Sequence, residues 1–574
     1  MSISLLATAA AAVVAAAAPP PHIVFFMADD LGRANVGFLR DDAPASEVRT
    51  PAIDALAADG LVLERMYAYM FCSPTRSSFL SGRLPLHVNT RNDDPSVWNA
   101  TSGEGAGIGT NMTGIAALLK RARYSTAAVG KWDAGMATVQ HTPAGRGFDR
   151  SLIYFHHCND YWTSTVSNAT DGFCSGDSAT VDLWRDGAPA KERAPGGAWE
   201  DVYEEEIFKA EASAIIGDFA RGNDGSSSGN DDGGGGGPRR LFLYYASHLP
   251  HTPMQVEQRV LDGFLNESAA LSLPGMGYAA MAAALDAAVA NVTAALRQHG
   301  MWNDTLFVFQ SDNGGPIYAA NFKATGDCPS ATRPGMTGPG GREPYRSTCL
   351  DFGGAANNWP LRGGKESCWE GGVRVAAFVG GGALPAAQRG TRCAGLLHTA
   401  DWLATFGAGL AGLDPTDARG AVSGLPPIDS LDMWPMLSGA NATSPRVEAA
   451  LGGVPGPRAL VTAQYKLLLG RAGAPGLGMD GWTGPHFPNA SSMNVSWPHA
   501  QTDCSGGCLF DLLADPTEHT DLARSMPEKV AELTARLEAA EATAWAPGRG
   551  TAQRKACDVA AANGGFYGPF EAPR

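Results

Sequence analysis

The sequence predicts an open α/β fold built around a mostly parallel sheet, followed by a smaller α+β unit at the C-terminus. Three segments are almost continuously apolar and end in a polar tip: residues 22–32, 241–255 and 305–315. Continuous apolar runs are typical of strands buried on both faces, as in a parallel sheet between helices. Helical patterns lie between these segments, and strands that alternate with helices indicate an α/β fold.

The clearest helical pattern lies between the second and third of these strands, at residues 279–300. Its apolar positions, among them Leu285, Val289 and Val292, recur at helical spacing. The pattern ends on Gly300, and glycine is the residue that most often terminates a helix.

The pattern changes near residue 440. Residues 458–470 predict a strand with a turn, and residues 527–544 predict an amphipathic helix. We therefore expect three parts: a signal peptide at 1–18, a large α/β domain at 19–440 and an α+β subdomain at 441–574. Two Gly-rich inserts, at 221–240 and 326–349, are interpreted as surface loops.

The first residues form an apolar run that ends in small residues before Pro19, as in a secretory signal. Ten cysteines suit an oxidising compartment. Nine N-x-S/T sequons support the same route, at Asn99, Asn111, Asn168, Asn266, Asn291, Asn303, Asn441, Asn489 and Asn494. This run is short for a membrane span, and we expect no membrane span, and no stretch long and apolar enough to form one, elsewhere in the chain. The net charge of −15 argues against a nucleic-acid partner.

The polar tips of two strands carry a candidate metal site. Asp29 and Asp30 follow the first strand, and Asp312 and Asn313 follow the third. Sites in α/β folds lie at the carboxyl ends of strands, so these side chains are expected to meet. Their oxygen-only set suits Ca²⁺ or Mg²⁺ rather than zinc. Helix capping is the alternative for either pair alone.

Two lysines and two histidines are further candidates. Lys131 and Lys365 lie in segments rich in Gly and Trp, which can bring a cation close to an anion. A solvated surface amine is the alternative for each. His248 and His251 follow the second strand and are candidate proton donors, against the alternative of an ordinary hydrogen-bonding role.

The segment CSPTR, residues 72–76, is too polar for a core strand. A buried thiol or half of a disulfide is the default interpretation of Cys72 in a secreted protein. However, CSPTR matches the signature C-x-P-x-R, and further blocks follow in order around it: DDLG, GKW, PHTP, SDNGG, NWPLRGGK and WEGGVR. Together they resemble the type I, formylglycine-dependent sulfatases over nearly the whole chain. The final GGFYGPF resembles the branch related to arylsulfatase B.

This resemblance implies an alkaline-phosphatase-like large domain and a smaller C-terminal α+β domain with an antiparallel sheet. It implies that Cys72 is oxidised to Cα-formylglycine by the formylglycine-generating enzyme, which needs Pro74 and Arg76. The hydrated aldehyde would attack sulfur, and the covalent sulfo-enzyme would then expel sulfate. The implied substrate is a sulfated small molecule or a sulfated glycan, and the implied destination is extracellular or lysosome-like.

The resemblance also assigns roles residue by residue. One Ca²⁺ is expected to bind Asp29, Asp30, Asp312, Asn313 and the modified residue 72. Arg76 would hold the diol, and Lys131 and Lys365 would contact sulfate oxygens. His251 would protonate the leaving oxygen.

One position departs from the family pattern. The family usually has GKWHLG, whereas this chain has GKWDAG, with Asp133 in place of histidine. We expect Asp133 to lie beside residue 72 and to act as the base for sulfate release. His141 is a possible substitute, although a structural role is the more common interpretation of such a histidine.

Two other functions stay open at this point. One is a phosphatase or phosphodiesterase of the same superfamily, which would use Ser or Thr and zinc. The other is a non-catalytic secreted glycoprotein that binds sulfated glycans.

We also expect Cys158 to be bridged to Cys174, and Cys328 to Cys349, because each pair flanks a loop.

Overall fold

The computed structural model describes residues 19–40, 47–166, 174, 180–223, 239–265, 271, 273–317, 355–453, 456–473, 480–487 and 502–572. The expected signal peptide, most of the 221–240 insert and the expected Cys328–Cys349 bridge lie outside these residues.

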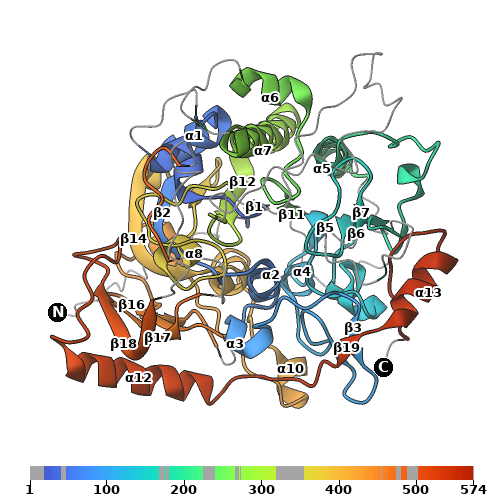
Figure 1. Cartoon of the computed structure of the whole chain (residues 1–574). Coiled ribbons are helices and arrows are strands. Elements are labelled where there is room, and N and C mark those ends of the chain that lie inside the picture. The colour runs from blue at the N-terminus through green and yellow to red at the C-terminus, as the bar shows by residue number, and fades with distance from the viewer. Residues whose placement is uncertain are drawn as a thin grey trace, which may run out of the picture.

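A ten-stranded sheet forms the centre of the large domain (Figure 1). Its strands, in spatial order, are β10 (Ala188–Pro189), β9 (Trp184–Arg185), β6 (Arg150–Tyr154), β5 (Tyr124–Lys131), β11 (Arg240–Ala246), β1 (His22–Ala28), β12 (Thr305–Ser311), β13 (Ala377–Gly380), β2 (Leu61–Tyr67) and β14 (Thr391–His398). The run from β6 to β12 is parallel, while β13 and the short β9 and β10 pair antiparallel with their neighbours. The predicted mostly parallel α/β sheet is therefore confirmed.

The three apolar runs predicted as strands are β1, β11 and β12, and β1 lies between the other two. Alternate side chains of β1 face opposite layers. Val24 and Phe26 join one core cluster, and Ile23 and Phe25 join the other. Because both faces are covered, every residue of β1 can be apolar, and this explains the continuous pattern.

Helices cover both faces of the sheet. One layer contains α1 (Pro51–Ala58), α5 (Glu204–Ala220), α6 (Gln258–Leu265) and α7 (Leu273–Gln298); the other contains α2 (Cys72–Ser81) and α4 (Ile115–Lys120). The predicted helix at 279–300 is α7, which begins earlier, at Leu273. Gly300 follows its end with φ of +70°, a left-handed conformation suited to glycine.

Among the described helices, α7 is long and apolar enough to cross a membrane by length and composition. In this structure it is a core helix: Leu285, Val289 and Val292 are fully buried in the cluster beneath the sheet. The expectation that no such segment exists is therefore wrong for α7, and burial in the core accounts for its apolar composition.

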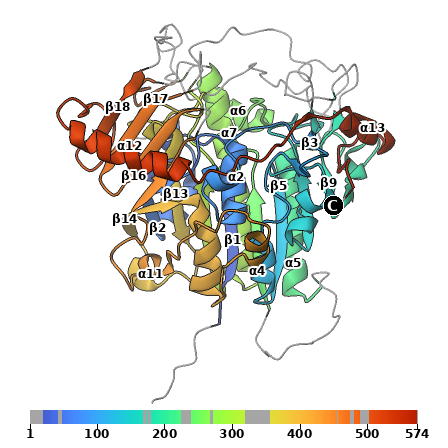
Figure 2. The same ribbon diagram turned by 90° about the horizontal axis from the view of Figure 1, so that it is seen from below.

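The C-terminal unit contains a four-stranded antiparallel sheet of β15 (Glu448–Ala450), β16 (Arg458–Thr462), β17 (Tyr465–Arg471) and β18 (Asp503–Asp511), with α12 (Pro527–Glu541) packed on it. The segment predicted as a strand with a turn is the β16–β17 hairpin. After α12 the chain crosses the molecule to β19 (Thr551–Ala552), which pairs with β3 (Val97–Asn99), and to α13 (Arg554–Ala562) on the opposite side (Figure 2).

The predicted Cys158–Cys174 bridge is wrong, because Cys174 is bonded to Cys557 of α13. Cys158 and Cys174 are close in sequence, and spacing alone suggested a local bridge. The real bond joins residues 383 positions apart and attaches the returning C-terminal segment to the large domain. A second bond joins Cys504 to Cys508 within β18.

A buried ionic cluster joins the C-terminal sheet to the large domain. The Lys466 amine on β17 lies 2.9 Å from carboxylates of both Glu370 and Glu518, and all three side chains are fully buried. The Tyr67 hydroxyl at the end of β2 donates to Glu370 at 2.9 Å. Glu370 begins α8 (Glu370–Val373), five residues after Lys365, so this cluster supports the segment that carries Lys365.

Replacing Lys466 with Met should strongly destabilise the protein, because two buried carboxylates lose their shared cation. The expected loss is ~3–5 kcal/mol in the free energy of unfolding, measured by chemical denaturation. Lys555→Met is the control, since it removes an exposed pair with Glu571 and should cost little. Equal free energies of unfolding for the two variants would contradict a stabilising role of the Lys466 cluster.

Peptide mapping of the non-reduced protein should recover a cross-linked pair that contains Cys174 and Cys557. The Cys504–Cys508 bond, closed within one short segment, serves as the internal control. Recovery of a Cys158–Cys174 peptide in its place would overturn this connectivity.

Candidate functional site

Four polar side chains meet where β1 and β12 end. The two strands pair in register up to Ala28 and Ser311, so the residues that follow them begin at the same level. The Asp30 backbone N–H donates to Asp312 Oδ1 at 3.1 Å, and Asn313 Nδ2 donates to Asp30 Oδ1 at 2.7 Å. Asp29 is the fourth member, and all four side chains are buried. The predicted meeting of the two polar tips is present in the structure.

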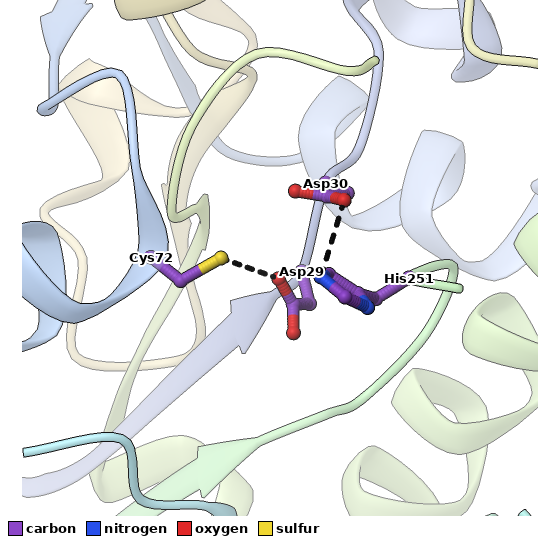
Figure 3. Close-up of side chains that lie close together, drawn as sticks. All are labelled: Asp29, Asp30, Cys72 and His251. Atoms are coloured by element: carbon purple, nitrogen blue, oxygen red, sulfur yellow. Dashed lines mark hydrogen bonds and ion pairs between the residues drawn. The ribbon is translucent and has the colours of Figure 1, made fainter. Parts of the chain in front are cut away.

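Cys72 reaches this cluster from the helix layer that contains α2 and α4. It is the first residue of α2, and its Sγ lies 3.4 Å from Asp29 Oδ1. Figure 3 shows Cys72 and His251 approaching Asp29 and Asp30 from opposite sides. One ligand atom from each of these four residues lies within 4.8 Å of the others.

Three cations from separate elements neutralise the three carboxylates. Arg76, one turn after Cys72 on α2, bonds Asp312 Oδ2 through Nε at 3.1 Å and Nη2 at 2.8 Å. Lys131 at the end of β5 places Nζ 2.6 Å from Asp29 Oδ2. Lys365 places Nζ 2.8 Å from Asp30 Oδ2. Because carboxylates this close repel each other, the buried cluster depends on these cations.

The pKa of Asp312 reflects the closeness of these carboxylates. Burial, together with the neighbouring Asp29, raises the pKa of Asp312 to about 6 despite the opposing effect of Arg76. Burial and the carboxylates of Asp29 and Asp312 also raise the pKa of the Cys72 thiol well above its ordinary value. An unmodified Cys72 is therefore a neutral thiol here rather than a thiolate nucleophile.

His251 lies against Lys365. Its Nδ1 is 2.7 Å from the Thr252 carbonyl, and its Nε2 is 3.1 Å from Lys365 Nζ. Burial, with Lys365 and Lys131, holds the pKa of His251 well below its usual range. His248, the other candidate, is fully buried, contacts Glu204 through Nδ1 at 3.1 Å and stacks on Tyr161. His248 is therefore held inside the protein by Glu204 and Tyr161, with its ring centroid 5.7 Å from that of His251.

Asp133 follows β5 and has a left-handed backbone conformation, with φ of +47°. Its Oδ1 is 3.0 Å from Nδ1 of His157, and its Oδ2 is 3.9 Å from Lys131 Nζ. Burial opposes ionisation, but His157, Lys131 and Arg76 together hold the pKa of Asp133 below its ordinary value. Asp133 is thus an ionised neighbour of the lysine that contacts Asp29.

Sequence reasoning considered His141 and missed His157. The described contacts of the His141 ring are with Thr138 and Trp98, and burial lowers its pKa to about 3. His157 follows β6, the parallel neighbour of β5. The available signal was that residues after adjacent parallel strands meet at one edge, but β6 was not recognised as a strand.

The cluster fits a hard divalent cation. Its donors are carboxylate and amide oxygens from Asp29, Asp30, Asp312 and Asn313, the set that Ca²⁺ and Mg²⁺ prefer. Within the described structure, Asn313 Oδ1 is buried and has no hydrogen-bond partner. A buried acceptor in that state indicates a missing partner, and a cation among these carboxylates would supply it.

The sulfatase family profile matches residues 21–412, which is more than half of the chain. The chain belongs to the sulfatase family. Membership makes the protein an enzyme that hydrolyses sulfate esters, and the family is known for a formylglycine modification and a metal ion.

The sulfatase is similar to curated relatives along most of its length. It is 28% identical to arylsulfatase J of Mus musculus over 90% of this chain and 75% of that protein. It is also 28% identical to arylsulfatase A of Homo sapiens, over 87% of this chain and 83% of the relative. The predicted membership of the sulfatase family is confirmed, and arylsulfatases are among the relatives that this chain resembles.

Solved structures share the fold of this sulfatase. Ps i-CgsB, solved in complex with k-i-k-neocarrahexaose, has a TM-score of 0.66 at 22% identity and covers 95% of this chain and 98% of its own. PsFucS1 sulfatase from Pseudoalteromonas sp. has a TM-score of 0.60 at 20% identity, with 91% and 90% covered. These likenesses confirm the alkaline-phosphatase-like fold expected from the sequence.

Proposed function

We propose that this sulfatase cleaves sulfate esters through a formylglycine formed at Cys72, with one Ca²⁺ held by Asp29, Asp30, Asp312 and Asn313. The observation that carries the proposal is the position of Cys72. Its Sγ lies 3.4 Å from a carboxylate of the candidate metal cluster, and Arg76 of the same helix bonds another. A structural thiol, or one half of a disulfide, would not need a carboxylate of the metal cluster and an arginine of the same helix beside it.

Formylglycine at residue 72 would supply a geminal diol, one hydroxyl of which is the nucleophile toward sulfur. Pro74 and Arg76 complete the motif that the formylglycine-generating enzyme needs as its substrate. Cys72 is only 1% exposed within α2. Conversion must therefore precede the packing of α2, and the maturation partner acts on an unfolded chain.

Ca²⁺ bound to the oxygen cluster would polarise the sulfate oxygens and lower the pKa of the nearby hydroxyl. Side chains of the protein would bind the sulfate, hold the site in place and donate the proton. Lys131 and Lys365 are placed to bind sulfate oxygens, where negative charge develops. Arg76 holds Asp312 and lies beside residue 72. His251 is placed to protonate the leaving oxygen, and the negative charge of a bound ester favours the protonated ring.

The proton released from residue 72 during sulfate departure needs an acceptor. Asp133 occupies the position where the family usually has histidine, and it stays ionised because His157, Lys131 and Arg76 lower its pKa. A carboxylate with a lowered pKa remains a base at acidic pH, where an imidazole would be protonated. We therefore assign Asp133 as the base.

The proposed substrate class is a sulfated small molecule or a sulfated glycan. The arylsulfatase relatives favour the first, and the complex of Ps i-CgsB favours the second. Disulfides at Cys174–Cys557 and Cys504–Cys508 support the secretory route, with an extracellular or lysosome-like destination. Sequon residues Asn111, Asn303 and Asn441 are exposed, as glycosylation requires.

Cys72→Ala should abolish turnover of an aryl sulfate and leave the thermal unfolding midpoint close to that of the native protein. The nucleophile is lost, while the small side chain still fits the buried helix. Mass spectrometry of the native residue-72 peptide should find an aldehyde. Cys393→Ala is the control, because this partly exposed cysteine lies on β14, outside the site. Full activity together with an unmodified thiol at residue 72 would refute the proposal.

Asp312→Asn should reduce the metal content and the activity together, because one charged ligand and the partner of Arg76 are lost. We expect an affinity loss of roughly 10–100-fold or more, measured by calcium titration and elemental analysis. Asp286→Asn removes a buried carboxylate that binds backbone amides of α1, and it should leave calcium unaffected. Stoichiometric zinc with phosphate-ester turnover would favour the phosphatase function instead.

A further inference from the structure

Asp133 and His157 come together because β5 and β6 are adjacent parallel strands. Lys131 is level with Tyr154 in this pairing, so the chain leaves both strands at the same edge of the sheet. Asp133 then lies two residues past Lys131, and His157 three residues past Tyr154. Their side chains meet with His157 Nδ1 3.0 Å from Asp133 Oδ1.

The two oxygens of Asp133 have different surroundings. Oδ1 accepts from His157, whereas Oδ2 is buried and has no hydrogen-bond partner within the described structure. Oδ2 is the oxygen nearer the reaction centre, since it lies 3.9 Å from Lys131 Nζ, which in turn contacts Asp29. A buried carboxylate oxygen without a donor is costly, so a protic group in the working site is the expected partner.

His157 determines which oxygen stays open. Across the described residues it is the only hydrogen-bond donor to the Asp133 side chain. The Asp133 backbone has the sparsely populated left-handed conformation, and such strain persists only where surrounding contacts hold it. The imidazole is 12% exposed and the carboxylate 2%, so the hydrogen bond lies in a sheltered place where it is strong.

We propose that His157 is the positioning residue for Asp133: its Nδ1–H holds Oδ1, so that Oδ2 faces the reaction centre as the proton acceptor. The inference rests on the proposed function. A proton from the second hydroxyl of hydrated residue 72 moves to Oδ2, the O–H electron pair forms the C=O bond, and sulfate leaves with the electrons of the broken C–O bond. His157 itself gains no proton in this step.

The test compares His157→Leu with His157→Asn. The Asn side chain can place an N–H donor close to the position of histidine Nδ1, but it lacks the second ring nitrogen. His157→Leu should give a burst of alcohol release and then turnover slowed roughly 10–100-fold, a part of the 10²–10⁴-fold effect of a general base. His157→Asn should stay within about threefold of the native enzyme, because the positioning hydrogen bond survives.

Three further measurements separate positioning from a structural role. In His157→Leu, kcat/KM and the affinity for inorganic sulfate should change little, because Lys131 and Lys365 are intact, whereas kcat and KM should fall together as the sulfo-enzyme accumulates. Asp133→Asn should show the same burst, and adding His157→Leu to it should slow turnover no further. The His87–Asp429 pair has the same ring exposure of 12% and a distance of 2.8 Å. His87→Leu therefore controls for the stability cost of losing such a pair and should show no burst.

Two results would overturn the inference. If His157→Asn is as slow as His157→Leu, the imidazole itself is needed and His157 is not a positioning residue. If His157→Leu shows no burst, Asp133 is positioned without it. Crystal structures of both variants give a readout independent of turnover: Asp133 should turn away from Lys131 only in His157→Leu. If native protein lacks the aldehyde, the proposed function fails, and this structural comparison still decides the positioning role.

Discussion

Three carboxylates buried at the end of two paired strands are the constraint on which the site depends. The parallel register of β1 and β12 brings Asp29, Asp30 and Asp312 to one level, where their charges repel each other. Arg76, Lys131 and Lys365 offset that repulsion, and they come from a helix, a third strand and a distant loop. The folding of these three elements is therefore coupled to the ionisation of one cluster.

The same need for cations explains why the C-terminal unit supports the site, although none of its described residues belongs to the carboxylate cluster. The Lys365 segment has little regular structure of its own, and it is held by neighbours from that unit. The Cys368 N–H donates to the Ala472 carbonyl at 2.7 Å, and the Gly363 N–H donates to the Gly481 carbonyl at 2.9 Å. Lys466 adds the buried ionic contact to Glu370. The C-terminal unit thus positions a cation that the large domain needs.

Asp133 stands where the family pattern usually has histidine, and neighbouring residues offset its negative charge. A carboxylate beside Lys131 adds negative charge where sulfate is expected, and an unpaired aspartate there would repel the sulfate group. His157 from the neighbouring strand end supplies a hydrogen bond, and Lys131 and Arg76 supply positive charge. One altered residue type is accommodated by groups that already lie at the same edge of the sheet.

The sequence by itself determined that β1, β11 and β12 are buried strands and which residue types stand at their ends. Continuous apolar runs indicate burial on both faces, and the motif around Cys72 is local, so both can be read from neighbouring residues. Only the tertiary structure decided that Cys174 bonds Cys557, that His157 contacts Asp133, and that β13 runs antiparallel to β12. These features depend on strand order and on contacts between residues distant in the chain. A linear pattern does not encode them, because it records the environment of each residue but not the identity of its partners.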